Sequence, residues 1–181
     1  MRQLLLLVCG LTAFVAIAAA PGKKNPPKHP TPPPVVANII EPLRPMAFLA
    51  GHCWRGDIPA TMMSDEHCFS WVLNGHVMRD THTVRTPGKP DFVGETTYFW
   101  NPAGKTVEYL YLASTGAFSR GVMETTANTL YVPPQGDGAN PVPVRSHWAP
   151  QGDDAYEAWN EEQGKDGMWN TTWRMTLRKV N

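Results

Sequence analysis

The sequence predicts an all-β domain: an antiparallel up-and-down barrel of about ten strands, preceded by a short helical turn. From Gly51 onward, turn signals such as Asn74-Gly75, "TPGKPD" and "NPAGK" recur about every 8 to 12 residues. The segments between them are rich in Tyr, Trp, Phe, Val and Thr, which favour strands. No segment has a sustained helical period, and the hairpins follow one another without long crossovers. This pattern favours a closed barrel over a Greek-key sandwich.

The N-terminal residues 1–20 have the pattern of a secretory signal peptide. Arg2 supplies a positive charge, the apolar run "LLLLVCGLTAFVAIA" follows, and the small residues of "AIAAA" offer a cleavage site. The run is too short for a stable membrane span, so we expect an exported protein, periplasmic or secreted, with no transmembrane segment in the mature chain. Residues 21–38, which include "PGKKNPPKHPTPPPVV", predict an extended Pro-rich linker. Residues 39–181 then form the barrel domain.

The composition argues against some classes of partner. Lys plus Arg and Asp plus Glu both number 16, so the formal net charge is zero, and no basic stripe is present. Nucleic acid is therefore not expected as a partner. All seven Trp residues follow residue 50, which indicates a domain with a large apolar interior or cavity. A closed barrel has no free edge strand to pair with a second copy, and we expect a monomer.

The start of the domain predicts a short helical turn at residues 43–51, "LRPMAFLAG", followed by the first strand. Two cysteines remain after removal of the signal peptide, Cys53 and Cys68. A lone pair in an exported protein most often forms a disulfide, and a free catalytic cysteine is the alternative. If the bond joins residues directly opposite each other on neighbouring antiparallel strands, Arg55 faces Glu66 as an oppositely charged pair.

The same register assigns an inward face to the first two strands. This aromatic face carries His52, Trp54, His67, Phe69, Trp71 and Leu73. Independently, Asn74-Gly75 predicts a two-residue type I′ turn. The pairs that follow from such a turn are Trp71 with Met78, Phe69 with Asp80 and His67 with His82. The two arguments agree, and they place His67 beside His82, with Trp54 and Asp80 nearby.

A few polar groups within aromatic walls are the usual composition of a ligand site. The residues that we expect to contact a small apolar or aromatic molecule are Trp54, His67, Phe69, Trp71, Asp80, His82 and Tyr98. Among them, His67, Asp80 and His82 would orient the molecule; the open alternative is that these three only hydrogen-bond one another. Two His and one Asp also match a metal triad, although such residues are common on one strand face. The chain lacks a Gly-x-Ser-x-Gly motif, a phosphate loop and a dinucleotide fingerprint, and we predict a binding protein without a cofactor rather than an enzyme.

Two later segments complete the predicted barrel. The turn "NPAGK" predicts that Tyr98 pairs with Val107. One face of that hairpin carries Tyr98, Trp100, Tyr109 and Tyr111, and the sequence leaves open whether this face points inward. The last strand is expected to close the barrel against the first. Its shared face is predicted to carry Trp169, Thr171, Trp173, Met175 and Leu177.

Both ends of the domain resemble calycin barrels, the group that contains lipocalins and nitrobindin-like proteins. In "FLAGHCWRG", Gly51 and Trp54 stand where calycins have a Gly and a Trp at the base of the first strand, with one more residue between them than usual. The ending "WRMTLRKV" resembles the last calycin strand, whose basic residue packs over that Trp; here Arg174 or Arg178 would do so. In layout the chain is similar to uncharacterised exported bacterial lipocalin-like proteins, and its strand count is similar to that of nitrobindins.

The resemblance implies a protein that holds a small molecule inside the barrel. Nitrobindins bind haem through a histidine near the C-terminus, whereas this chain has no histidine after His147. A haem- or metal-dependent enzyme that uses His147, or His67 with His82, is therefore an alternative function. A structural envelope protein without a ligand is a further alternative.

Overall fold

The computed structural model describes residues 38–58, 61–126, 129–134 and 143–180, which all belong to one compact unit, Thr31–Asn181. The predicted signal peptide and residues 21–37 of the predicted linker lie outside the described residues. The elements are the 3₁₀ helices η1 (Glu41–Met46) and η3 (Leu73–Gly75) and the strands β1 (Cys53–Ile58), β2 (Met63–Val72), β3 (Val77–Arg85), β4 (Phe92–Asn101), β5 (Thr106–Ala113), β6 (Phe118–Thr125), β7 (Leu130–Val132), β8 (Val144–Pro150), β9 (Ala155–Gln163) and β10 (Trp169–Val180).

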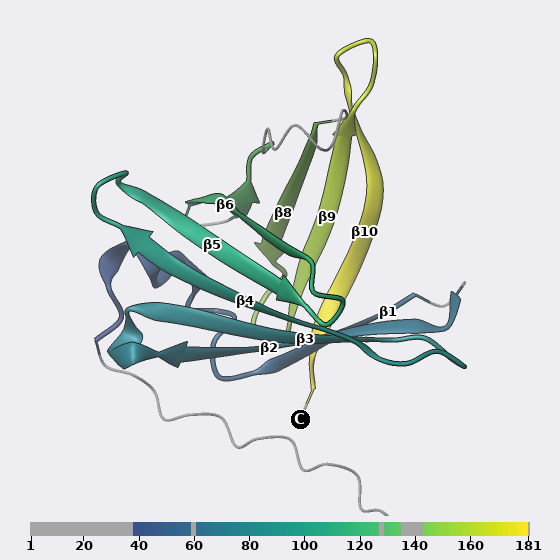
Figure 1. Ribbon diagram of the computed structural model, residues 1–181, viewed down its shortest axis with the longest axis horizontal. Helices are drawn as coiled ribbons and strands as arrows, with labels where there is room; N and C mark the ends of the chain where they lie inside the picture. The colour runs from purple at the N-terminus through teal and green to yellow at the C-terminus, as the bar shows by residue number, and fades with distance from the viewer. Residues whose placement is uncertain (1–37, 59–60, 127–128, 135–142, 181) are drawn as a thin grey trace, which may run out of the picture. The chain divides into compact units, whose positions relative to one another are not determined.

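The ten strands form a closed antiparallel barrel in which each strand pairs with its neighbours in the chain. The ring closes between the first and last strands, where Cys53 pairs with Val180 and Arg55 with Arg178. In Figure 1, β2 to β5 form one wall and β8 to β10 rise on the other side. The predicted all-β, up-and-down architecture is confirmed. The predicted helical turn is also present, although as η1 it begins two residues earlier than expected, at Glu41.

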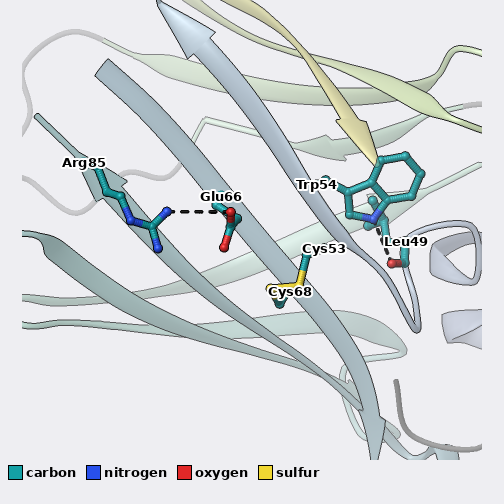
Figure 2. Close-up of a disulfide and its surroundings, with 6 residues drawn as sticks. All are labelled: Leu49, Cys53, Trp54, Glu66, Cys68 and Arg85. Atoms are coloured by element: carbon teal, nitrogen blue, oxygen red, sulfur yellow. Dashed lines mark hydrogen bonds and ion pairs between the residues drawn. A yellow bond between two sulfur atoms is a disulfide. The ribbon is translucent and has the colours of Figure 1, made fainter. Parts of the chain in front are cut away.

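A disulfide joins β1 to β2, as predicted. Cys53 and Cys68 are bonded and directly paired, so Arg55 lies opposite Glu66. The expected ion pair between those two is wrong, however. Arg55 Nε lies 3.0 Å from Asp57 Oδ1 on its own strand. Glu66 instead pairs with Arg85 of β3 (Figure 2), with 3.7 Å between Glu66 Oε2 and Arg85 Nη1. Because β2 lies between β1 and β3, Glu66 can reach an arginine on either neighbouring strand, and it pairs with Arg85 of β3. The strand register alone does not determine which of the two arginines it contacts.

The β2–β3 hairpin has the predicted register, with Trp71 opposite Met78 and His67 opposite His82. Leu73 and His52, which were predicted on the inward face, are exposed instead, since both lie just beyond the ends of their strands. Asn74 (φ 57°, ψ 36°) and Gly75 (φ 82°) have left-handed backbone conformations, and the His76 N–H donates to the Leu73 carbonyl at 3.2 Å. These are the features of the two-residue turn that Asn-Gly favours. A Cβ on Gly75 would lie 2.7 Å from the Asn38 carbonyl oxygen, so glycine is required here both by its backbone and by its neighbour.

Helix η1 packs into the core beside Trp54. Leu43 and Met46 of this helix and the following Leu49 are fully or almost fully buried. The Trp54 indole N–H donates to the Leu49 carbonyl at 2.9 Å, as Figure 2 shows, and its ring meets that of Tyr156 edge-on at 5.3 Å. This hydrogen bond links the helical segment to the first strand. It also supplies a donor to the buried Leu49 carbonyl, which would otherwise be unsatisfied.

The β4–β5 register differs from the prediction by two residues. Tyr98 pairs with Tyr109, not with Val107, because the turn beyond the last pair, Asn101–Thr106, holds four residues rather than the two that the predicted register leaves. The Asn101 side-chain oxygen accepts from two backbone N–H groups of the turn, at 3.0 and 3.2 Å, which fixes where the turn begins. A shift of two keeps the same alternation of faces. The tyrosine face was left open by the sequence, and in the structure it points into the barrel.

Strand β10 contains an irregularity between Thr171 and Trp173 that the sequence did not reveal. It shifts the alternation, so Trp173, Met175 and Leu177 face inward while Thr171 is exposed. Trp169 lies under Arg145, whose guanidinium carbon is 4.1 Å from the ring centroid. The prediction that Trp169 and Thr171 share the face of the other three is therefore wrong, because an extra residue in a bulge reverses the facing of all positions beyond it.

The basic residue over Trp54 is Lys179, not Arg174 or Arg178 as expected. Lys179 pairs with Trp54 across β1 and β10, and its Nζ lies 5.3 Å from the ring centroid. Arg174 instead lies over Trp159, 5.0 Å from that ring centroid. Alternation explains the difference, since the two arginines occupy the exposed positions of β10 and Lys179 shares its face with the buried Leu177.

Candidate ligand site

A cavity of about 200 Å³ lies within the barrel, bordered by strands β2 to β8. Its lining residues are His67, Asp80, His82, Thr96, Tyr98, Tyr109, Tyr111, Ser119, Val132, Ser146 and Trp148. Four of the seven residues predicted to contact a ligand are among them: His67, Asp80, His82 and Tyr98. The other three, Trp54, Phe69 and Trp71, pack in the buried core rather than in the cavity lining.

The polar side chains of this site form one connected group, which we call the histidine cluster: Asp65 and His67 of β2 with Asp80 and His82 of β3. His67 Nδ1 lies 2.8 Å from Asp80 Oδ2, and its Nε2 lies 3.2 Å from Asp65 Oδ2. His82 Nδ1 lies 3.4 Å from Asp65 Oδ1, and the two imidazole rings stack with centroids 4.8 Å apart. The predicted proximity of His67, His82 and Asp80 is thus present, with Asp65 as a fourth member.

The charges of the cluster stabilise one another. Burial by itself lowers the pKa of His67, but the Asp80 and Asp65 carboxylates outweigh it and raise the pKa to about 10. Burial by itself raises the pKa of Asp65, and the hydrogen bonds from His67 and His82 outweigh it and hold that pKa well below its usual range. Because carboxylates only accept, His67 donates from both ring nitrogens in this arrangement and carries a proton that neutralises one of the two carboxylates.

One oxygen of Asp80 stands apart from this network. The Asp80 side chain is 3 % exposed, and its Oδ1 is buried without a hydrogen-bond donor among the described residues. The neighbouring Tyr98 is fully buried, and burial together with the Asp80 charge raises its pKa well above the usual value. A buried carboxylate oxygen without a donor is costly, and Asp80 belongs to the cavity wall.

A second cavity, of about 300 Å³, lies between β1 to β3 and β9 to β10. Asp65 is part of its lining, together with apolar side chains such as Ile58, Trp173 and Met175. Since His67 and His82 line the first cavity and both contact Asp65, the histidine cluster borders both spaces. The cluster is therefore reachable from two sides of the barrel interior.

Several site residues were missed by the sequence reasoning. Asp65 lies two positions before His67, so the same alternation of faces places it inward. Tyr111 closes the cluster on the β5 side, where its hydroxyl lies 3.1 Å from His82 Nε2. Trp148 comes from β8, more than sixty residues along the chain from His82. Only the closure of the barrel brings it to the site, and no local pattern signals this.

Gly94 makes room for the cluster. It pairs with His82 across β3 and β4, and a Cβ at this position would collide with His82 Nε2 and lie 2.6 Å from Cε2 of Tyr111. A glycine within a strand is the usual signal that another group approaches the backbone closely. The aromatic ring and the imidazole thus occupy the space that a side chain would fill.

We expect Gly94→Ala to displace the His82 ring and to lower the free energy of unfolding by about 1–3 kcal/mol, as overpacking does. Urea unfolding followed by tryptophan fluorescence measures this. The control is Val93→Ala, because the Val93 side chain is 44 % exposed and its truncation should cost no more than about 0.5 kcal/mol. Equal losses in the two variants would contradict the close packing of His82 over Gly94.

His147, named as an alternative haem ligand, does not line the cavity. Its Nε2 lies 3.0 Å from Glu161 Oε2, and its ring stacks on Trp159 with centroids 4.6 Å apart. Ser146 and Trp148, the residues on either side, line the cavity instead, so alternation turns His147 to the outer face of β8.

Comparison with protein-family models finds no match, and comparison with curated proteins finds no relative. The closed ten-stranded antiparallel barrel is consistent with a calycin-like fold. Among the described residues, no helix has the length and apolar character needed to cross a membrane.

Proposed function

We propose that the protein is an exported small-molecule binding protein, similar to bacterial lipocalin-like and nitrobindin-like proteins, that holds a single-ring aromatic molecule inside its barrel. Export is supported by the signal-peptide pattern of residues 1–20 and by the Cys53–Cys68 disulfide, which is typical of oxidising compartments. The observation that supports the ligand class is that Asp80, which lines an aromatic cavity, has a buried Oδ1 for which the described part of the chain offers no hydrogen-bond donor.

The cavity selects by size and by chemistry. An engineered apolar cavity of about 150 Å³ is known to hold one benzene molecule, so a space of about 200 Å³ accommodates one substituted ring. Tyr98, Tyr109 and Trp148 offer aromatic surface to such a ring, and aromatic pairs gain energy beyond simple burial. Asp80 Oδ1 accepts one hydrogen bond, so the preferred ligand carries a hydroxyl or amino group, as a phenol or an aromatic amine does.

The remaining predicted contact residues have a supporting part in this proposal. Phe69 packs behind the cavity, stacked against His67 with ring centroids 5.9 Å apart, and Trp54 and Trp71 lie in the adjoining core. Haem is a poorer candidate, because the cavity volume lies below the range of about 300–1,000 Å³ typical of cofactor and drug-sized ligands.

The test compares para-cresol with toluene, which has the same ring and methyl group but no hydroxyl. Calorimetric titration of the oxidised mature protein, with EDTA present, should show that para-cresol binds and that toluene binds at least about tenfold more weakly, because a hydrogen bond to a charged group contributes about 1.5–3 kcal/mol. In Asp80→Asn, the amide oxygen should turn to the His67 N–H and leave an NH₂ donor at the Oδ1 position. The preference for para-cresol should then disappear.

Two further variants locate the binding. Ser146→Leu places a larger side chain in the cavity and should abolish binding of both molecules. Ser70→Leu makes the same change on β2 at a position that alternates outward from Phe69 and Trp71, and it should leave binding unchanged. No binding by the wild type, no difference between the two molecules, or normal binding by Ser146→Leu would each overturn the proposal.

A further inference from the structure

Three potential metal-ligand groups converge within the histidine cluster. The ligand atoms of Asp65, His67 and His82 all lie within 4.8 Å of one another. An Asp65 oxygen is 3.2 Å from His67 Nε2, and its other oxygen is 3.4 Å from His82 Nδ1. Ligand atoms bound tetrahedrally at 2.0–2.2 Å from one ion lie about 3.3–3.6 Å apart. The spacing around Asp65 is therefore already close to that of a coordination shell.

The other nitrogen of each imidazole has a partner that orients the ring. His67 Nδ1 lies 2.8 Å from Asp80 Oδ2, and His82 Nε2 lies 3.1 Å from the Tyr111 hydroxyl. Metal-binding histidines usually donate their second N–H to a carboxylate or another acceptor, which fixes the tautomer and directs the lone pair of the remaining nitrogen at the ion. This outer pairing is an observation separate from the convergence of the ligand atoms. It leaves His67 Nε2 and His82 Nδ1 facing Asp65.

The charge of the cluster fits a divalent cation. Asp65 and Asp80 have side chains that are 18 % and 3 % exposed, and within the described part of the chain neither forms an ion pair with a lysine or arginine. Buried carboxylates are generally paired or bound to a metal. In the metal-free cluster the His67 proton compensates one of these two charges. A metal ion bound at His67 Nε2 displaces that proton to solvent, and the two carboxylates with two neutral imidazoles then carry a charge of −2, which one divalent ion balances.

We propose that Asp65, His67 and His82 bind one divalent transition-metal ion, with Asp80 and Tyr111 as positioning residues. Two imidazole nitrogens and a carboxylate oxygen suit Zn²⁺ and its neighbours in the first row rather than Mg²⁺ or Ca²⁺, which prefer oxygen ligands. Three protein ligands leave at least one coordination position for a small molecule. Because the cluster borders both cavities, that position is accessible from the barrel interior. This site goes beyond the proposed aromatic-binding function and does not depend on it.

The test is calorimetric titration of ZnCl₂ into untagged, oxidised mature protein that has been stripped with EDTA and dialysed. We expect one ion per chain. Asp65→Asn, His67→Gln and His82→Gln should each weaken binding at least about 100-fold, since each removes a ligand. Asp80→Ala, which removes the acceptor that faces His67 Nδ1, should weaken it about 10- to 100-fold, as loss of an outer partner does. The matched control is His147→Gln. His147 also contacts a carboxylate, that of Glu161, but no second histidine lies beside it within the described residues, so this variant should leave the affinity unchanged.

A readout on the wild type keeps the proposal testable if a variant fails to fold, which near-UV circular dichroism in EDTA would reveal. The Cu²⁺-loaded protein should give an electron paramagnetic resonance spectrum with superhyperfine coupling to two imidazole nitrogens. Coupling to fewer than two nitrogens, absence of Zn²⁺ binding, or an equal loss of affinity in His147→Gln would overturn the metal site. Binding of para-cresol is measured in EDTA, so failure of the metal site leaves the proposed function intact, and the reverse also holds.

Discussion

Trp54→Ala is expected to lower the free energy of unfolding by about 3–5 kcal/mol, as deletion of a fully buried aromatic side chain does. The Trp54 side chain is 1 % exposed and packs edge-on against Tyr156. Its indole N–H is also the donor to the Leu49 carbonyl. The substitution therefore leaves both a cavity and a buried carbonyl without its donor. Urea unfolding of the oxidised protein measures the loss.

Two comparisons separate these contributions. Trp54→Phe keeps most of the packing and removes only the hydrogen bond, so it should cost about 1–3 kcal/mol. Trp169→Ala deletes a tryptophan from the outer face, where it lies under Arg145, and should cost only about 1 kcal/mol. A loss for Trp54→Ala no larger than for Trp169→Ala would show that Trp54 does not anchor the core.

Removal of the disulfide is the second large effect that we expect. Cys53 and Cys68 are 15 residues apart, and in the loop-entropy model closing such a loop stabilises the folded state by about 3 kcal/mol. The double variant Cys53→Ser/Cys68→Ser should unfold at a correspondingly lower urea concentration. It should still form the barrel, because β1 also pairs with β10 and β2 also pairs with β3.

Reducing agent provides the control. It should lower the unfolding midpoint of the wild type to that of the double variant and should not change the midpoint of the double variant. A wild-type midpoint that is insensitive to reductant, under conditions in which free thiols appear on denaturation, would contradict a stabilising disulfide. The slope of the unfolding transition should also rise on reduction, because the unfolded chain then exposes more surface.

The first two hairpins were predictable in register because short-range chemistry fixes them. The Asn74-Gly75 turn admits one favoured geometry, and a bond between Cys53 and Cys68 requires those residues to lie close together. Once these two registers are known, the alternation of side chains places His67, Asp80 and His82 on one face. The same rule, continued to Asp65, yields the remaining member of the histidine cluster.

The later registers were less predictable because the local sequence admits more than one solution. The turn after Asn101 depends on a side-chain contact with two backbone N–H groups, and it shifted the pairing of Tyr98 by two residues. The irregularity near Trp173 depends on how β10 fits against β9. Three-dimensional packing also decides which carboxylate each arginine pairs with and which basic residue lies over the Trp54 ring. The position of Trp148 in the cavity wall depends on packing in the same way.

The histidine cluster and the aromatic lining of the cavity differ in how far apart their residues lie in the sequence. The three proposed metal ligands lie in one hairpin between residues 65 and 82, whereas Trp148 and the β1–β10 seam bring together residues far apart in the chain. Contacts that are distant in sequence form more slowly, because a longer loop must be closed first. If the chain folds after export, as proposed above, a metal ion would therefore meet its three ligands before the barrel closes. The aromatic molecule would find its pocket only after β8 has docked and brought Trp148 to it.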